Sequence, residues 1–132
     1  MDGNRLVLDA SAMVDLLLGA PPTLAIRLRL LGGQLHTPAH FDAEVLSALG
    51  RLSRADIISA TVVPALLPRV QNARIQRHPV GPLLTGAWGR RGDLRLVDAL
   101  YVELAERLDA PIISTDDRLV AAAARAENPA VS

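Results

Sequence analysis

The sequence predicts an α/β protein, a three-layer α/β/α sandwich around a central and mostly parallel sheet. Short apolar runs alternate along the chain with longer segments of helical periodicity, which is the pattern of strands joined by crossover helices. The runs at residues 6–8 and 111–114 lack polar alternation, as parallel strands buried on both faces do. No internal repeat or linker is visible, so residues 1–132 are expected to form one domain.

Turn residues divide the chain into four candidate strands and seven candidate helices. The expected elements are, in order, strand 6–8, helices 12–20 and 23–31, strand 34–37, a helix from residue 40, helix 53–63, strand 74–80, helices 81–91 and 93–108, strand 111–114 and helix 119–127.

In the first half, glycine and proline mark where elements end. Gly19 and the two prolines after it end the first helix, and a glycine pair ends the second. The second helix carries its leucines on one stripe, at positions 24, 28 and 31. Ser53 is a plausible N-cap of a helix running to about Val63, where Pro64 would end or kink it.

In the second half, the helix at 93–108 has the strongest signal, because its apolar residues form a wide stripe with Asp98 inside it. The last helix is expected from the alanine-rich run at 119–127. Phe41 and Trp88 are expected in the core, since aromatic residues are so few here.

Composition excludes several classes of site. The formal net charge is zero, so affinity for nucleic acid would have to come from a local patch. Cysteine is absent, which excludes disulfides and thiolate metal sites, and all fourteen basic residues are arginine. No secretory signal and no apolar stretch of about 20 residues is visible. The chain is therefore expected in the cytoplasm.

Four acids stand at strand ends or on inward helix faces: Asp9, Glu44, Asp98 and Asp116. Carboxylates are costly there unless something compensates them, and the nearby arginines are expected on solvated faces. Three of the acids also have a simpler explanation, because Asp9 and Asp116 (or Asp117) could cap helices and Glu44 could interact favourably with the dipole of its helix. Asp98 is harder to explain in this way, because apolar residues surround it on the inward stripe of its helix.

A carboxylate cluster without cysteine, and without histidines at metal-ligand spacing, selects a hard ion, Mg²⁺ or Mn²⁺. Such an ion accepts phosphate oxygens and activates water, so the cluster indicates phosphodiester hydrolysis.

The chain resembles the PIN-domain ribonucleases and, within them, the VapC toxins of toxin–antitoxin pairs. The resemblance covers nearly the whole chain and rests on three segments, VLDASA at 7–12, LVDALYVELA at 96–105 and IISTDDRL at 112–119.

The resemblance implies a metal-dependent endoribonuclease acting on tRNA or rRNA, with Asp9, Glu44, Asp98 and Asp116 as the catalytic cluster and Mg²⁺ or Mn²⁺ as cofactor. Asp9, Asp98 and Asp116 would hold the metal, and the supporting residues would be Ser11, Ser114, Thr115 and Asp117. It also implies a homodimer and a VapB-type antitoxin that blocks the site.

Residues 69–95 carry six arginines and one acid, which suggests a phosphate-binding face with Arg90 and Arg91 as the best candidates for RNA contact; solvated surface charge or antitoxin contact is an equal alternative.

Other acidic-pocket classes fit less well. A receiver domain needs a lysine, a haloacid-dehalogenase-type phosphatase needs an acid at position 11, and no glycine-rich phosphate loop is present. Two alternatives stay open: a PIN-like scaffold that binds a protein without cleaving RNA, and a housekeeping RNA-processing nuclease.

Overall fold

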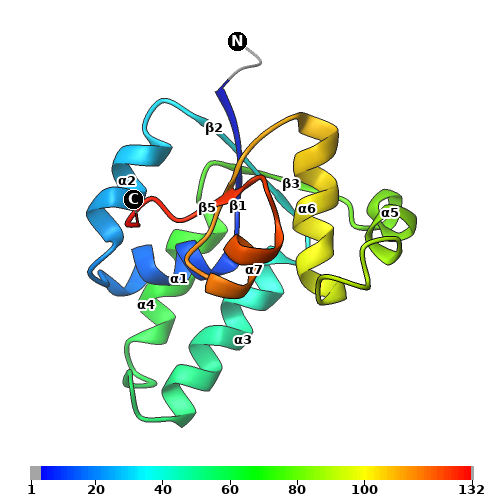
Figure 1. Ribbon diagram of the computed structural model, residues 1–132. Helices are drawn as coiled ribbons and strands as arrows, with labels where there is room; N and C mark the ends of the chain where they lie inside the picture. Colours follow the sequence, from blue (N-terminus) through cyan, green and yellow to red (C-terminus); the bar gives the residue numbers. More distant parts are fainter. Residues whose placement is uncertain (1–3, 132) are drawn as a thin grey trace.

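A single parallel sheet organises the computed structural model, which describes residues 4–131 (Figure 1). Its strand order is β3-β2-β1-β4-β5, and every neighbouring pair runs parallel. The strands are β1 (Arg5–Leu8), β2 (Gln34–Pro38), β3 (Ile75–His78), β4 (Ile112–Ile113) and β5 (Ala126–Glu127). The predicted α/β class with a parallel sheet is confirmed.

Helices cover the sheet on both sides. They are α1 (Ala10–Leu18), α2 (Thr23–Leu30), α3 (Phe41–Arg54), α4 (Val63–Gln71), the 3₁₀ turn η2 (Gly81–Leu83), α5 (Leu84–Trp88), α6 (Leu96–Leu108) and α7 (Asp117–Ala122). Figure 1 shows α5 and α6 together on one side of β1, and α1, α2 and α4 on the other. Within residues 4–131, no helix has the length and apolar character needed to cross a membrane.

The central strand β1 explains why the chain folds around this sheet. Val7 and Leu8 are essentially inaccessible, as an apolar run between two helical layers should be. Each such side chain contributes about 1.5–3 kcal/mol on burial. Because β1 and β4 are neighbours and run parallel, Asp9 and the residues after β4 leave the sheet at the same edge.

Two predicted helices are wrong. The helix expected at 53–63 does not exist, because α3 continues through Ser53 to Arg54 and Pro64 lies in the first turn of α4. Proline is tolerated in a first turn, where its missing N–H has no helical partner, so Pro64 opens a helix instead of ending one. The helix expected at 119–127 stops at Ala122, because residues 126–127 pair with β4 as β5. Strand pairing overrides the helical preference of alanine there.

The leucine stripe of α2 faces solvent, since Leu24, Leu28 and Leu31 are 69%, 64% and 81% exposed, and Ile26 is the buried residue of this helix. One burial prediction is wrong. Trp88 is 57% exposed, and the guanidinium carbon of Arg91 lies over its ring, 4.7 Å from the ring centroid. The expectation for Phe41 is confirmed, since its side chain is fully buried.

Candidate active site

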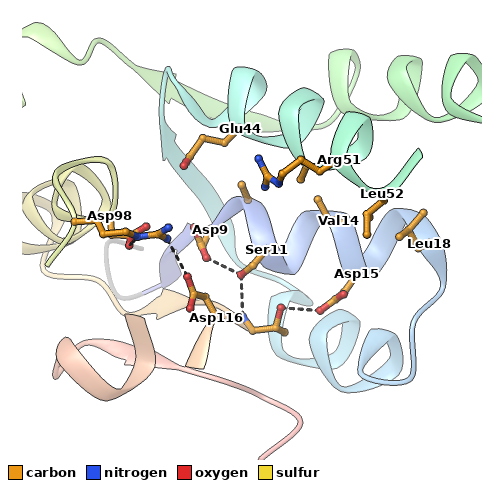
Figure 2. Close-up of a pocket in the computed structure, with 14 residues that line it drawn as sticks. Asp9, Ser11, Val14, Asp15, Leu18, Glu44, Arg51, Leu52, Asp98 and Asp116 are labelled. Carbon is orange, nitrogen blue, oxygen red and sulfur yellow. Dashed lines mark hydrogen bonds and ion pairs between the residues drawn. The ribbon is translucent and has the colours of Figure 1, made fainter. Parts of the chain in front are cut away.

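A pocket of about 430 Å³ opens beyond the ends of β1 and β4 (Figure 2). We call it the acid pocket, because five carboxylates line it: Asp9, Asp15, Glu44, Asp98 and Asp116. They come from the β1–α1 junction, from α1, α3 and α6, and from the start of α7. The four acids singled out in the sequence therefore line one cavity, although up to 107 residues separate them in the chain.

Asp9 lies deepest and is 5% exposed. Its Oδ2 accepts hydrogen bonds from the hydroxyls of Ser11 at 2.6 Å and Ser114 at 2.8 Å. Burial raises the pKa of Asp9, the two hydroxyls lower it, and repulsion from Asp98 and Asp116 raises it again. Asp9 is the N-cap residue of α1 but makes no capping bond with its side chain. Its side chain instead accepts one hydroxyl from Ser11 in the first turn of α1 and one from Ser114 after β4.

A hydroxyl network joins the two strand ends around Asp9. The backbone N–H of Thr115 donates to Ser11 Oγ, and that of Asp116 donates to Ser114 Oγ, both at 3.0 Å. The Thr115 hydroxyl donates to Asp15 Oδ2 at 2.6 Å. These bonds fix the β4–α7 turn against the first turns of α1 and so hold Asp116 beside Asp9.

Glu44 reaches the pocket from the first turn of α3. The hydroxyl of Tyr101 donates to Glu44 Oε1 at 2.6 Å, and His40 Nε2 lies 3.3 Å from the same oxygen. Burial raises the pKa of Glu44; Tyr101 and His40 lower it, whereas Asp9 and Asp98 raise it. Burial also raises the pKa of the Tyr101 phenol, with the charges of Asp9 and Glu44 adding to the effect, so this hydroxyl stays a donor.

Arg95 bridges two acids of the pocket. Its Nε donates to Asp98 Oδ2 at 2.8 Å and its Nη2 to Asp116 Oδ2 at 3.4 Å. The Arg95 side chain is 58% exposed, as expected of the nearby arginines, but it also compensates two of the acids. Asp116 also accepts the backbone N–H of Arg118 and caps α7, so its capping role and its place in the pocket coexist.

The other predicted residues lie outside the pocket. Arg90 is paired with Glu103 at 3.1 Å, and Arg91 stacks on Trp88; neither lines the acid pocket. Asp117 is exposed in the first turn of α7 and does not line it either.

Sequence reasoning missed four residues that line or support the pocket: Asp15, Arg51, Arg95 and Tyr101. Helical spacing could have found three of them, because Asp15 lies four residues after Ser11, Arg51 seven after Glu44 and Tyr101 three after Asp98. Arg95 precedes its helix in an extended conformation, and nothing in the pattern shows which way its side chain turns.

The donor set fits a hard divalent cation. The pocket offers carboxylate and hydroxyl oxygens, and Asp9 is a buried carboxylate that forms no ion pair with any of residues 4–131. As the side chains of residues 4–131 stand, no three His, Asp or Glu converge closely enough to coordinate one ion. Asp98 and Asp116 each turn one carboxylate oxygen, Oδ2, towards Arg95 instead.

Comparison with known proteins gives a consistent result. The chain matches the PIN domain family over residues 6–125. It is 50% identical to ribonuclease VapC3 of Mycobacterium tuberculosis over 90% of this chain and 88% of that protein. It is 37% identical to ribonuclease VapC12 of the same species, over 86% and 88% of the two chains. The crystal structure of PAE2754 from Pyrobaculum aerophilum superposes with a TM-score of 0.67 at 20% identity, covering 94% of this chain and 83% of that one.

Proposed function

Because the chain belongs to the PIN-domain family and is a VapC-type toxin ribonuclease, we propose that it is a Mg²⁺- or Mn²⁺-dependent endoribonuclease whose active site is the acid pocket. We further propose that residues 1–132 act as one catalytic domain, in the cytoplasm where its RNA substrate is found. The observation that carries the proposal is the gathering of Asp9, Glu44, Asp98 and Asp116 around one cavity.

In this proposal Asp9, Asp98 and Asp116 hold the cation, and Ser11 and Ser114 orient Asp9 through their bonds to its Oδ2. The bound cation would act as a Lewis acid on the phosphate and lower the pKa of water. Placing a cation among these acids also relieves their mutual repulsion and the cost of burying Asp9.

Glu44 is the proposed proton acceptor for the attacking water. Its Oε1 is held by Tyr101, so Oε2 is the atom that would take the proton. A carboxyl whose pKa burial has raised is closer to the working pH and so is a better base than an exposed one.

For substrate contact, Arg51 is a stronger candidate than the arginines chosen from sequence. It lines the pocket from α3, where Figure 2 shows its guanidinium extending between Glu44 and Ser11, and its Nη1 bonds only to the Ser47 hydroxyl. Arg90 and Arg91 remain candidates for a second contact, farther along a bound strand of RNA.

Two further parts of the proposal follow from the family. A VapB-type antitoxin would pair with this chain and occupy the acid pocket, and the free protein would be a homodimer. The RNA would be a structured one, tRNA or rRNA, cut at a single site. Expressing the chain alone is expected to arrest growth, and co-expressing the antitoxin is expected to restore it.

The decisive experiment incubates purified protein with tRNA and rRNA in Mg²⁺, in Mn²⁺ and in EDTA. EDTA and Asp98→Asn are each expected to reduce cleavage by about 100-fold or more, since outer-shell partners of metal ligands alone are worth 10–100-fold. Asp93→Asn is the matched control, because Asp93 is exposed and does not line the acid pocket. Cleavage that survives both EDTA and Asp98→Asn would contradict the proposal, and growth arrest by the Asp98→Asn protein would favour a protein-binding scaffold.

A further inference from the structure

Arg95 is paired with two of the acids that are proposed to hold the cation. Its single guanidinium donates a hydrogen bond of 2.8 Å to Oδ2 of Asp98 and a longer one, of 3.4 Å, to Oδ2 of Asp116. These are two of the three proposed metal ligands, and the third, Asp9, lines the same pocket. The guanidinium therefore lies between two of the acids that the proposed cation would bind.

We propose that Arg95 is an internal counter-cation that competes with the divalent ion for Asp98 and Asp116 and withdraws from them when the ion binds. This inference rests on the proposed function. It assigns Arg95 a positioning and regulatory role: the side chain keeps the acids compensated before the ion arrives, and it sets how tightly the ion binds.

The burial of the two partners explains why the bond can be exchanged. Asp98 is 5% exposed, so leaving its carboxylate without any cation would be costly. The Arg95 side chain is 58% exposed against 8% for the Asp98 side chain, so water can take the place of the carboxylates around its guanidinium. Asp98 therefore needs a cation, but Arg95 can give it up at small cost.

The backbone at Arg95 allows this movement. Arg95 is the N-cap residue of α6, with extended dihedral angles, and its carbonyl accepts the N–H groups of Asp98 and Ala99. Those bonds hold the start of the helix independently of the side chain. The guanidinium can swing towards solvent without disturbing α6.

The two cations exclude each other by charge. A guanidinium has no lone pair with which to join a coordination shell, and a divalent ion on the same carboxylate repels it at short range. Arg51 provides the comparison within the chain, because it lines the same pocket but donates to Ser47 and to none of the acids. Its charge acts on the ion through space only.

The first test measures Mn²⁺ affinity of the RNA-free protein by titration calorimetry, for wild type, Arg95→Gln and Arg51→Gln. Arg95→Gln is expected to bind Mn²⁺ about two- to fivefold more tightly, because it removes one competing ion pair. Arg51→Gln removes the same charge from the same pocket and is expected to change the affinity less than twofold. Equal effects of the two substitutions, or none from Arg95→Gln, would overturn competition by Arg95.

The second test uses the wild-type protein, so it does not depend on a variant that folds. In a ¹⁵N NMR titration with Mg²⁺, the Arg95 Nε–H signal is expected to shift and to exchange faster with water as its bond to Asp98 is lost. The Arg125 Nε–H, bonded to Glu106 at 2.7 Å, is the control and is expected to stay in place.

Failure of this inference and failure of the proposed metal-dependent function would give different results. If the backbone signals of Asp98 and Asp116 move with Mg²⁺ while the Arg95 Nε–H signal does not, the ion binds without displacing Arg95 and this inference is wrong. If neither cation binds wild type or variants at millimolar concentration, the metal-dependent function itself is wrong.

Discussion

At the scale of single residues, the acid pocket contains a buried carboxylate that the proposed function requires but that lowers the stability of the folded protein. Asp9 is a carboxylate buried at the end of the central strand, compensated by two hydroxyls and by no cation among residues 4–131. Burial raises its pKa, which means that the folded chain disfavours the charged form of Asp9. The apo protein is therefore strained at this position in a way that a bound cation would relieve.

Replacing Asp9 with Asn is expected to stabilise the metal-free protein at pH 7 by about 0.5–2 kcal/mol while abolishing cleavage. Asn keeps an oxygen that accepts the Ser11 and Ser114 hydroxyls, and it removes the buried charge. Denaturant unfolding in EDTA measures the change, and Asp93→Asn is the exposed control.

The pH dependence of that gain has a definite sign. The folded-state pKa of Asp9 lies above its ordinary value of 3.8, so its charge destabilises the folded state increasingly as the pH rises through the folded pKa. Well below pH 3.8 the carboxyl is protonated in both states. The advantage of Asp9→Asn is expected to shrink towards zero as the pH falls to that range; an advantage that does not change with pH would show that charge is not its cause.

Tyr101→Phe tests the hydrogen bond that tunes Glu44. Losing the phenol is expected to cost about 1 kcal/mol of stability, and it removes a donor that lowers the pKa of Glu44. The pKa of Glu44 should rise, so activity should be lost at a higher pH on the acid side of the profile of kcat/KM. An unchanged acid limb would mean that another group, and not Glu44, must be deprotonated for cleavage.

At the scale of elements, the parts that carry the pocket could be predicted, and the parts that surround it less well. The apolar run of β1 and the apolar stripe of α6 identify Asp9 and Asp98. Both elements are buried, and a buried element can be recognised directly from the pattern of apolar residues in the sequence. Pro64 and the alanine-rich end were misread because helix starts and strand pairing depend on tertiary contacts. The direction of the Arg95 side chain has no sequence signal at all.

Gly33, in the turn between α2 and β2, packs closely against Leu6 of β1, and a substitution there tests this contact. A Cβ added at Gly33 would lie 2.6 Å from Leu6 Cδ1 and 3.2 Å from the Leu30 carbonyl oxygen. Gly33→Ala is therefore expected to destabilise the protein by about 1–3 kcal/mol, as overpacking of a core does. Gly81→Ala is the matched control, because a Cβ there meets nothing within 4 Å and its effect should stay within about 0.5 kcal/mol. Equal unfolding midpoints for the two variants would contradict this account.

At the scale of the whole molecule, folding cancels a charge asymmetry that the sequence displays. The arginine-rich segment 69–95 is not a free basic face, since three of its arginines are paired with acids: Arg77 with Asp42, Arg90 with Glu103, and Arg95 with Asp98 and Asp116. Charge runs read along a chain say nothing about partners from other elements. With zero formal net charge as well, the protein is expected to hold RNA through few phosphate contacts.

The salt dependence of RNA binding measures how many contacts there are. With Arg51 and a released Arg95 as the two phosphate ligands, the slope of log K against log salt is expected to be about −1.4, at 0.7 per contact for single-stranded RNA. The measurement uses the inactive Asp98→Asn protein, so that binding is observed without cleavage. Adding Arg51→Gln should weaken binding and reduce the slope by about 0.7.

The same measurement decides between the two candidate RNA faces. Substituting Arg90 and Arg91 together leaves the acid pocket unchanged, because neither residue lines it. If this double variant flattens the slope and Arg51→Gln does not, RNA lies across α5 and the turn after it. Since that turn leads directly into α6, the RNA would then enter the pocket past Arg95. The guanidinium that withdraws from Asp98 would contact the first phosphate of the RNA that enters the pocket.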